Sequence, residues 1–169
     1  MSRNHLAFAG PLVVVVDGDC ALCIGLVEWM GRRLSRRSEI LPGIVVFVPG
    51  QSDLGGEVLR RASVADFDSV LVVSGGVVLT ESSAVLALAT ILPRGYRALA
   101  AVARLVPKSW RDAAYRAVAR RRIRIWGRAE VCAIDSRVTG ATYGPRGLLD
   151  RAEALRLLVQ AGALAAGMG

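Results

Sequence analysis

The first regular pattern in the chain is an unbroken run of apolar residues at 12–16, mostly valine, which predicts a buried strand. The polar segment 17–19, Asp-Gly-Asp, follows it and is typical of a turn. Further on, apolar side chains recur three and four positions apart, which is the spacing of one helix face. They are Cys23, Leu26, Val27, Met30 and Leu34. We therefore expect a strand, a turn and then a helix over 20–36.

The rest of the chain alternates between short apolar runs and helical patterns, separated by Pro and Gly residues. The predicted strands are 44–48, 69–73 and 77–79, and the predicted helices are 54–62, 82–92, 96–106 and 109–125. Glycines between the last two strands indicate a hairpin. A final helix should begin at Asp150, where Glu153 completes a capping box. This order indicates an α/β fold with a small mixed sheet, whose first two strands run parallel.

Two cysteines, Cys20 and Cys23, lie at the start of the first predicted helix. The first backbone N–H groups of a helix have no partner within it, and together with the helix dipole they favour a thiolate at Cys20. Cys23 lies one turn further along, close enough to form a disulfide with Cys20. Because such a dithiol can cycle between reduced and oxidised forms, the spacing indicates redox chemistry.

The composition favours one globular domain, because 169 residues can bury a sizeable core and 53% of them are hydrophobic. Three cysteines are too few for a disulfide scaffold. No apolar stretch reaches the ~20 residues that span a bilayer. Arg3 and the apolar stretch 6–16 loosely resemble a signal peptide, but Pro11 interrupts the stretch and cleavage would remove the first strand. We therefore expect a cytoplasmic protein.

The net charge of +8 comes from one segment. Residues 94–128 contain eleven basic residues and one acid, Asp112, whereas the rest of the chain has eleven basic and thirteen acidic residues. One interpretation is a non-catalytic binding module that engages an anionic partner or membrane surface. In the other, the basic residues are the solvated face of an amphipathic helix, because Ala, Val and Ile lie between them. The arginines concerned are Arg116, Arg120, Arg121, Arg122, Arg124 and Arg128.

The segment 17–23, Asp-Gly-Asp-Cys-Ala-Leu-Cys, resembles the signature of the DCC family of thiol-disulfide oxidoreductases. Further residues follow in that family's order: Asp68, Ser69, Gly76, Ser82, Ser83, Ala84, Pro107, Asp112, Tyr115, Ala119, Arg122, Gly127 and Cys132. The resemblance covers about residues 12–132 and implies a thioredoxin-like mixed sheet flanked by helices, with additional C-terminal helices. Residues 1–132 would form the DCC domain, and residues 133–169 a C-terminal extension with one helix in the same globular unit.

The dithiol suggests specific roles in thiol-disulfide exchange. We expect Cys20, as the more exposed thiol at the helix start, to be the nucleophile, and Cys23 to resolve the mixed disulfide. Asp17 has two interpretations: a catalytic base that takes a proton from Cys23, or a side chain that caps the turn. Asp19 fits a turn or capping role better than a catalytic one.

A substrate groove is expected beside the dithiol, formed by Asp19, Ala21, Leu22, Asp68 and Ser69. Thioredoxin-like enzymes generally carry a proline before a later strand, facing the dithiol, and this chain has none there. The groove would therefore have a polar and acidic lip. The third cysteine, Cys132, is either a further redox partner or, as we favour, a small buried apolar residue.

No cofactor is expected, because the chain has no glycine-rich phosphate-binding loop of recognisable spacing. A structural zinc site usually needs four Cys or His ligands, and only Cys132 and His5 are available to complete the pair at 20 and 23. We therefore expect no metal. The expected partners are a protein or small-molecule thiol or disulfide and an electron donor of unknown identity, with no specific nucleic acid.

Overall fold

The computed structural model of the protein describes residues 11–35, 45–64, 67, 70–128, 142–144, 147–149 and 151–163. The predicted strand, turn and helix at its start are confirmed, as β1 (Leu12–Val16) and α1 (Ala21–Ser35). The remaining elements are β2 (Val45–Pro49), α2 (Asp53–Arg61), β3 (Leu71–Ser74), β4 (Val77–Thr80), α3 (Glu81–Ile91), α4 (Arg94–Ala103), α5 (Lys108–Trp126), β5 (Thr142–Gly144), β6 (Gly147–Leu149) and α6 (Arg151–Gln160).

The strands form one mixed sheet in the order β4-β3-β1-β2-β5-β6. β1 pairs with β2 in parallel, as expected for a strand–helix–strand unit, and with β3 in the antiparallel sense. The β3–β4 hairpin is also confirmed: Gly75 and Gly76 form its turn with φ of 56° and 76°, which glycine adopts without strain. β5 and β6 were not predicted from the sequence, because each has three residues and contains glycine.

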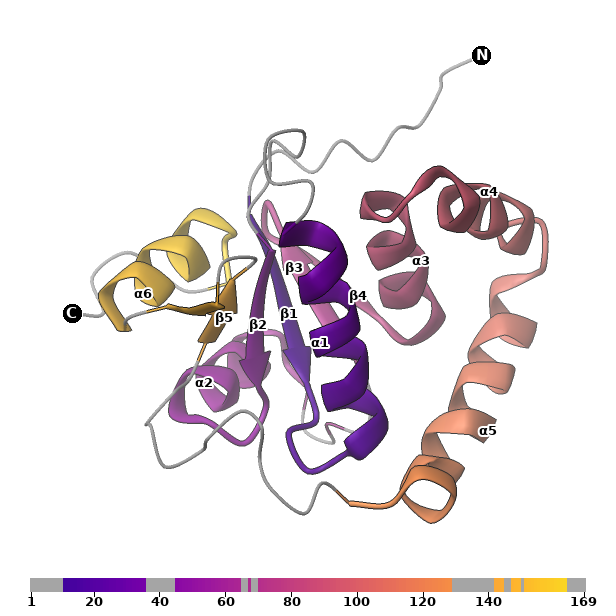
Figure 1. The fold of residues 1–169 in the computed structure, drawn as a ribbon, viewed down its shortest axis with the longest axis horizontal. Coiled ribbons are helices and arrows are strands. Elements are labelled where there is room, and N and C mark those ends of the chain that lie inside the picture. Colours follow the sequence, from indigo (N-terminus) through magenta and orange to yellow (C-terminus); the bar gives the residue numbers. More distant parts are fainter. Residues whose placement is uncertain are drawn as a thin grey trace.

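Helices cover both faces of the sheet (Figure 1). Alternate residues of β1 point to opposite faces, so Val13 and Val15 pack with α2 and α6, while Val14 and Val16 pack with α1 and α3. β1 is buried along its whole length because both faces are covered. The predicted α/β architecture is therefore confirmed, with β1 at its centre and the thioredoxin-like layout of β1, α1 and β2.

The C-terminal part of the chain completes one side of this fold. β5 pairs with β2 through Phe47 and Tyr143, and α6 buries Ala154, Leu157 and Leu158 in the core that also contains Val13. The boundary expected at residue 132 stays a prediction, because residues 129–141 lie outside the described ranges.

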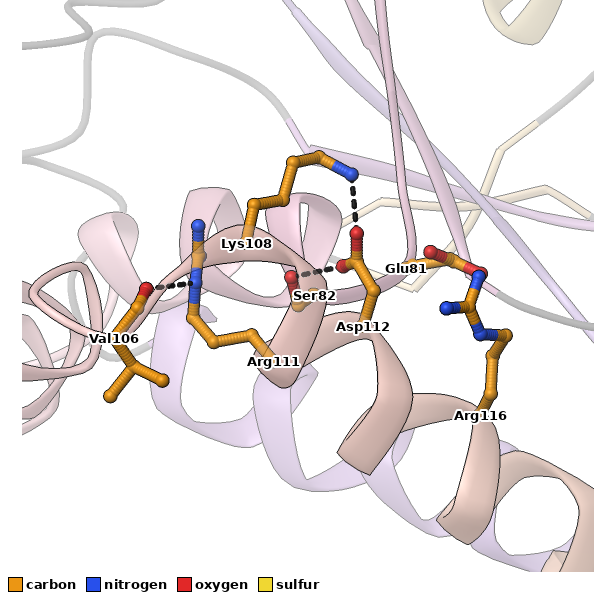
Figure 2. Close-up of polar contacts among 7 residues, drawn as sticks. All are labelled: Glu81, Ser82, Val106, Lys108, Arg111, Asp112 and Arg116. Carbon is orange, nitrogen blue, oxygen red and sulfur yellow. Dashed lines mark hydrogen bonds and ion pairs between the residues drawn. The ribbon is translucent and has the colours of Figure 1, made fainter.

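Helix α5 is attached to α3 by a polar junction (Figure 2). Ser82 of α3 donates a hydrogen bond to one oxygen of Asp112 on α5, and Lys108 donates to the other. These hydrogen bonds, that of Lys108 first, lower the pKa of Asp112 to about 2, so its carboxylate is charged at neutral pH. Nearby, Arg116 of α5 forms an ion pair with Glu81 of α3, with 3.3 Å between Nη1 and Oε1. The junction fixes where the N-terminal half of α5 lies against α3.

Truncation of Leu158 tests whether α6 belongs to the cooperative core. Leu158 is completely buried in the core that contains β1. We expect Leu158→Ala to lower the free energy of unfolding by about 3 kcal/mol, measured by urea denaturation. Arg156→Ala, on the exposed side of the same helix, should change it by less than about 0.5 kcal/mol. Equal effects of the two substitutions would show that α6 is not part of the folded unit.

Candidate functional site

The dithiol lies where β1 gives way to α1, as the sequence predicts. The chain turns after Val16, and the carbonyl of Cys20 accepts the first helical hydrogen bond, from Ile24 N at 3.0 Å. Cys20 therefore lies immediately before the helix, where the first backbone N–H groups of α1 have no partner within the helix. Both cysteines are free thiols, and Cys23 follows one turn later.

The expectation that Cys20 is the more exposed thiol is wrong. Cys20 is completely buried, whereas Cys23 is half-buried. The backbone of Cys20 also forms an isolated antiparallel bridge with that of Arg128. The chain that leaves α5 therefore lies beside Cys20, an arrangement that sequence spacing cannot reveal.

The surroundings of Cys23 disfavour its ionisation. Burial raises the pKa of Cys23, and the hydrogen bond with Cys20 acts in the same direction, to about 12. The charge of Arg122 opposes this rise, and that of Asp17 adds to it. Cys23 is therefore a protonated thiol at neutral pH, able to donate a hydrogen bond to the sulfur of Cys20.

Asp17 is the most heavily bonded side chain at this site. Its Oδ2 accepts a hydrogen bond from Arg122 Nη2 at 2.7 Å, and its Oδ1 accepts from Gln51 Nε2 at 2.7 Å and from the backbone N of Asp19 at 3.0 Å. Burial by itself raises the pKa of Asp17, but the hydrogen bonds, that of Arg122 first, outweigh it and lower the pKa below 3.8. These contacts favour the turn-capping interpretation of Asp17, because a lowered pKa makes a weaker base.

Two residues at the site were not assigned to it from the sequence. Gln51, after β2, bonds to Asp17 and accepts a hydrogen bond from Gly18 N at 3.0 Å. We expected Arg122 to be among the basic surface residues, and that placement is wrong. The side chain of Arg122 is 7% exposed and forms an ion pair with Asp17. One feature of the sequence does point to this position of Arg122. Tyr115, Ala119 and Arg122 have helical spacing, which puts Arg122 on the inner face of α5.

A cavity of about 520 Å³ lies beside the dithiol, between α1, α3 and α5. Leu22 and Cys23 form its wall on α1, Val85 contributes from α3, and Tyr115 and Val118 from α5. Its lining is almost entirely apolar, so it suits an apolar group better than a polar one.

The expected groove is only partly recovered in this cavity. Of the five groove residues predicted, Leu22 lines the cavity, whereas Asp19 is exposed and Ala21 is not part of the lining. Asp68, Ser69 and Cys132 lie outside the described residues, so the predicted acidic lip and the role of Cys132 stay predictions. Within the described ranges, no three His, Cys, Asp or Glu side chains are grouped so that they could hold a metal ion.

Comparison with known proteins identifies the class. The family model of the DCC1-like thiol-disulfide oxidoreductases matches residues 14–128. The chain is also 30% identical over 126 residues to the uncharacterized protein YuxK of Bacillus subtilis (strain 168), covering 73% of this chain and 87% of that protein. No solved structure gives a significant match. The chain therefore belongs to the DCC1-like thiol-disulfide oxidoreductase family, and the resemblance seen in the sequence is confirmed.

The ion pair of Asp17 makes stability depend on pH. We expect Asp17→Asn to lower the free energy of unfolding at pH 7 by roughly 3 kcal/mol, because Arg122 loses its charged partner. The pKa of Asp17 is lower in the folded protein than in the unfolded chain, so the unfolded chain binds the proton first as the pH falls. The difference between wild type and variant should therefore shrink below about pH 3.8.

Urea denaturation at several pH values measures this difference, and Asp19→Asn is the matched control, because the side chain of Asp19 is exposed. The control should differ from wild type by less than about 0.5 kcal/mol at pH 7. A loss in Asp17→Asn that does not change with pH would contradict the assignment of a charged pair.

Proposed function

We propose that the protein is a thiol-disulfide oxidoreductase in which Cys20 is the nucleophile and Cys23 the resolving thiol. The observation that carries the proposal is the place of the pair at the start of α1. Cys20 lies immediately before the first helical turn, where the free N–H groups and the helix dipole favour a thiolate, and Cys23 lies one turn further along. Membership of the family supports the reaction class.

The proposed reaction transfers two electrons to a disulfide. The Cys20 thiolate attacks one sulfur of the substrate, the substrate S–S bond breaks, and the other sulfur leaves as a thiolate. Cys23 then gives up its proton and attacks the sulfur of Cys20, which releases the second substrate sulfur. The products are two substrate thiols and a Cys20–Cys23 disulfide, which the electron donor reduces again.

Arg122 has a positioning role in this proposal. Its positive charge favours the ionised form of the neighbouring Cys23. In our proposal the same charge attracts a thiolate on Cys20, because the two sulfurs are hydrogen-bonded neighbours. Asp17 holds the guanidinium in place through the 2.7 Å bond to Nη2. In this role Asp17 acts through Arg122 and the turn, and we do not assign it the part of a base.

Access to Cys20 requires a local movement. Cys20 is completely buried, and its backbone forms a bridge with that of Arg128, directly after Gly127, whose φ is 79°. In our proposal this short bridge separates so that a substrate can reach the sulfur. The apolar cavity that reaches Cys23 would then hold the apolar groups beside the substrate sulfur.

Single cysteine variants test the two roles. With an aromatic disulfide such as dithiobis(nitrobenzoate), Cys23→Ser should retain a mixed disulfide on Cys20, because the resolving thiol is gone. Cys20→Ser should react much more slowly at Cys23, because burial raises the pKa of that thiol. Mass spectrometry under non-reducing conditions identifies the modified cysteine. Rapid reaction of Cys20→Ser together with an inert Cys23→Ser would reverse the assignment.

Two substitutions test whether the positive charge of Arg122 matters for the dithiol. We expect Arg122→Gln to slow alkylation of Cys20 by iodoacetamide several-fold at pH 7, and Arg122→Lys to restore most of the rate, because lysine keeps the positive charge. Circular dichroism confirms that both variants are folded. Equal rates in Gln and Lys variants would show that Arg122 serves packing and not the charge of the dithiol.

A further inference from the structure

The turn between α4 and α5 exposes an unusual number of large apolar side chains. Leu105 is 83% exposed, Trp110 73%, Leu99 66% and Val102 62%, and Val106 is also exposed. We call these five residues the apolar turn. In Figure 1 the connection between α4 and α5 lies at the outer edge of the molecule, on the side opposite α6. Folded proteins keep such patches small, and a larger patch marks an interaction site.

The same two helices carry most of the excess positive charge. Arg111 is half-buried and Arg122 is buried, but the other basic residues of the segment are exposed. These are Arg94, Arg97, Arg104, Lys108, Arg116, Arg120, Arg121, Arg124 and Arg128. The one acid of the segment, Asp112, is buried and bonded to Ser82 and Lys108. The exposed surface of α4 and α5 is therefore apolar and basic, with no acid of its own.

We propose that the apolar turn docks on an anionic lipid bilayer, with its apolar side chains among the acyl chains and the surrounding basic residues at the headgroups. Arg104 stands directly before Leu105, so its charge reaches the headgroups when the turn is inserted, whereas Lys108 is held by Asp112. An indole such as that of Trp110 is favoured at the membrane interface.

A lipid surface fits these observations better than other partners. Leu105 projects from a convex turn, which a fluid bilayer can accommodate without a preformed pocket, whereas a rigid protein partner would have to supply one. A nucleic acid would pair with the basic residues but would leave Leu99 and Leu105 in water. No helix in the described part of the chain is long and apolar enough to cross a membrane, so the contact proposed is with the surface.

Docking at this turn would also orient the cavity. Ala103, at the end of α4, and Arg111, near the start of α5, line the same cavity that Cys23 borders. The apolar turn and the cavity are thus neighbours, and docking would bring the cavity close to the acyl chains. The binding itself does not depend on the dithiol, so failure of the redox proposal would leave it standing.

Vesicle sedimentation tests the proposal with the full chain. We expect binding to vesicles of phosphatidylcholine mixed with phosphatidylglycerol, little binding to phosphatidylcholine alone, and weaker binding as salt is raised. The double variant Leu105→Ser/Trp110→Ser should bind at least roughly tenfold more weakly, because two large apolar side chains are lost. Val77→Ser is the matched control, since Val77 is 58% exposed on β4, away from the turn, and it should bind like wild type.

Trp110 supplies an independent readout. Its fluorescence should shift to shorter wavelength when anionic vesicles are added, and Trp110→Phe should remove most of that shift while leaving binding nearly unchanged. Equal binding to neutral and anionic vesicles, or a double variant that binds like wild type, would overturn the proposal. So would a dimer in solution that forms through the apolar turn and shows no vesicle binding.

Discussion

The ion pair between Asp17 and Arg122 is the contact on which the arrangement of the site depends. It joins the end of the central strand β1 to the inner face of α5, over a distance of 2.7 Å and with both side chains largely buried. A buried pair of this kind holds two elements in register, because neither charge can be left alone in a dry environment. The ion pair thereby connects the turn before Cys20 to the C-terminal half of α5, beside the cavity between α1 and α5.

The two faces of helix α5 lie in different environments. Its inner face supplies Tyr115, Ala119 and Arg122 to the wall beside the dithiol, while its outer face carries exposed arginines and apolar residues. The polar junction at Asp112 and the ion pair at Arg122 hold it at two points, one near each end. This explains how a helix with few buried apolar side chains keeps a fixed position against α1 and α3.

The parts of the fold that local patterns encode were predictable from the sequence. The valine run, the Asp-Gly-Asp turn and the apolar spacing after Cys23 specify β1, the turn and α1, because each signal lies within a few neighbouring residues. The hairpin at Gly75 and Gly76 was predictable for the same reason. β5 and β6 were not, because three-residue strands that contain glycine give no alternating pattern.

The site itself was predictable only in part. The spacing of Cys20 and Cys23 gave the dithiol and its place before a helix. The backbone neighbour of Cys20 is Arg128, and the charge beside the dithiol belongs to Arg122, and both residues lie about a hundred positions further along the chain. Such contacts between distant segments are products of tertiary structure. In the sequence, Arg122 differs from the exposed arginines around it by its helical spacing to Tyr115 and Ala119, and this signal did not by itself assign Arg122 to the site.

The central claim is that Cys20 and Cys23 form a reversible redox pair. Equilibration of the protein in buffers of reduced and oxidised dithiothreitol, followed by acid quenching and mass spectrometry, tests it most directly. We expect a single two-electron transition, in which oxidation links Cys20 to Cys23 and removes two hydrogens. Two cysteines that stay reduced in every buffer, or an oxidised form in which Cys20 and Cys23 are not joined to each other, would contradict it.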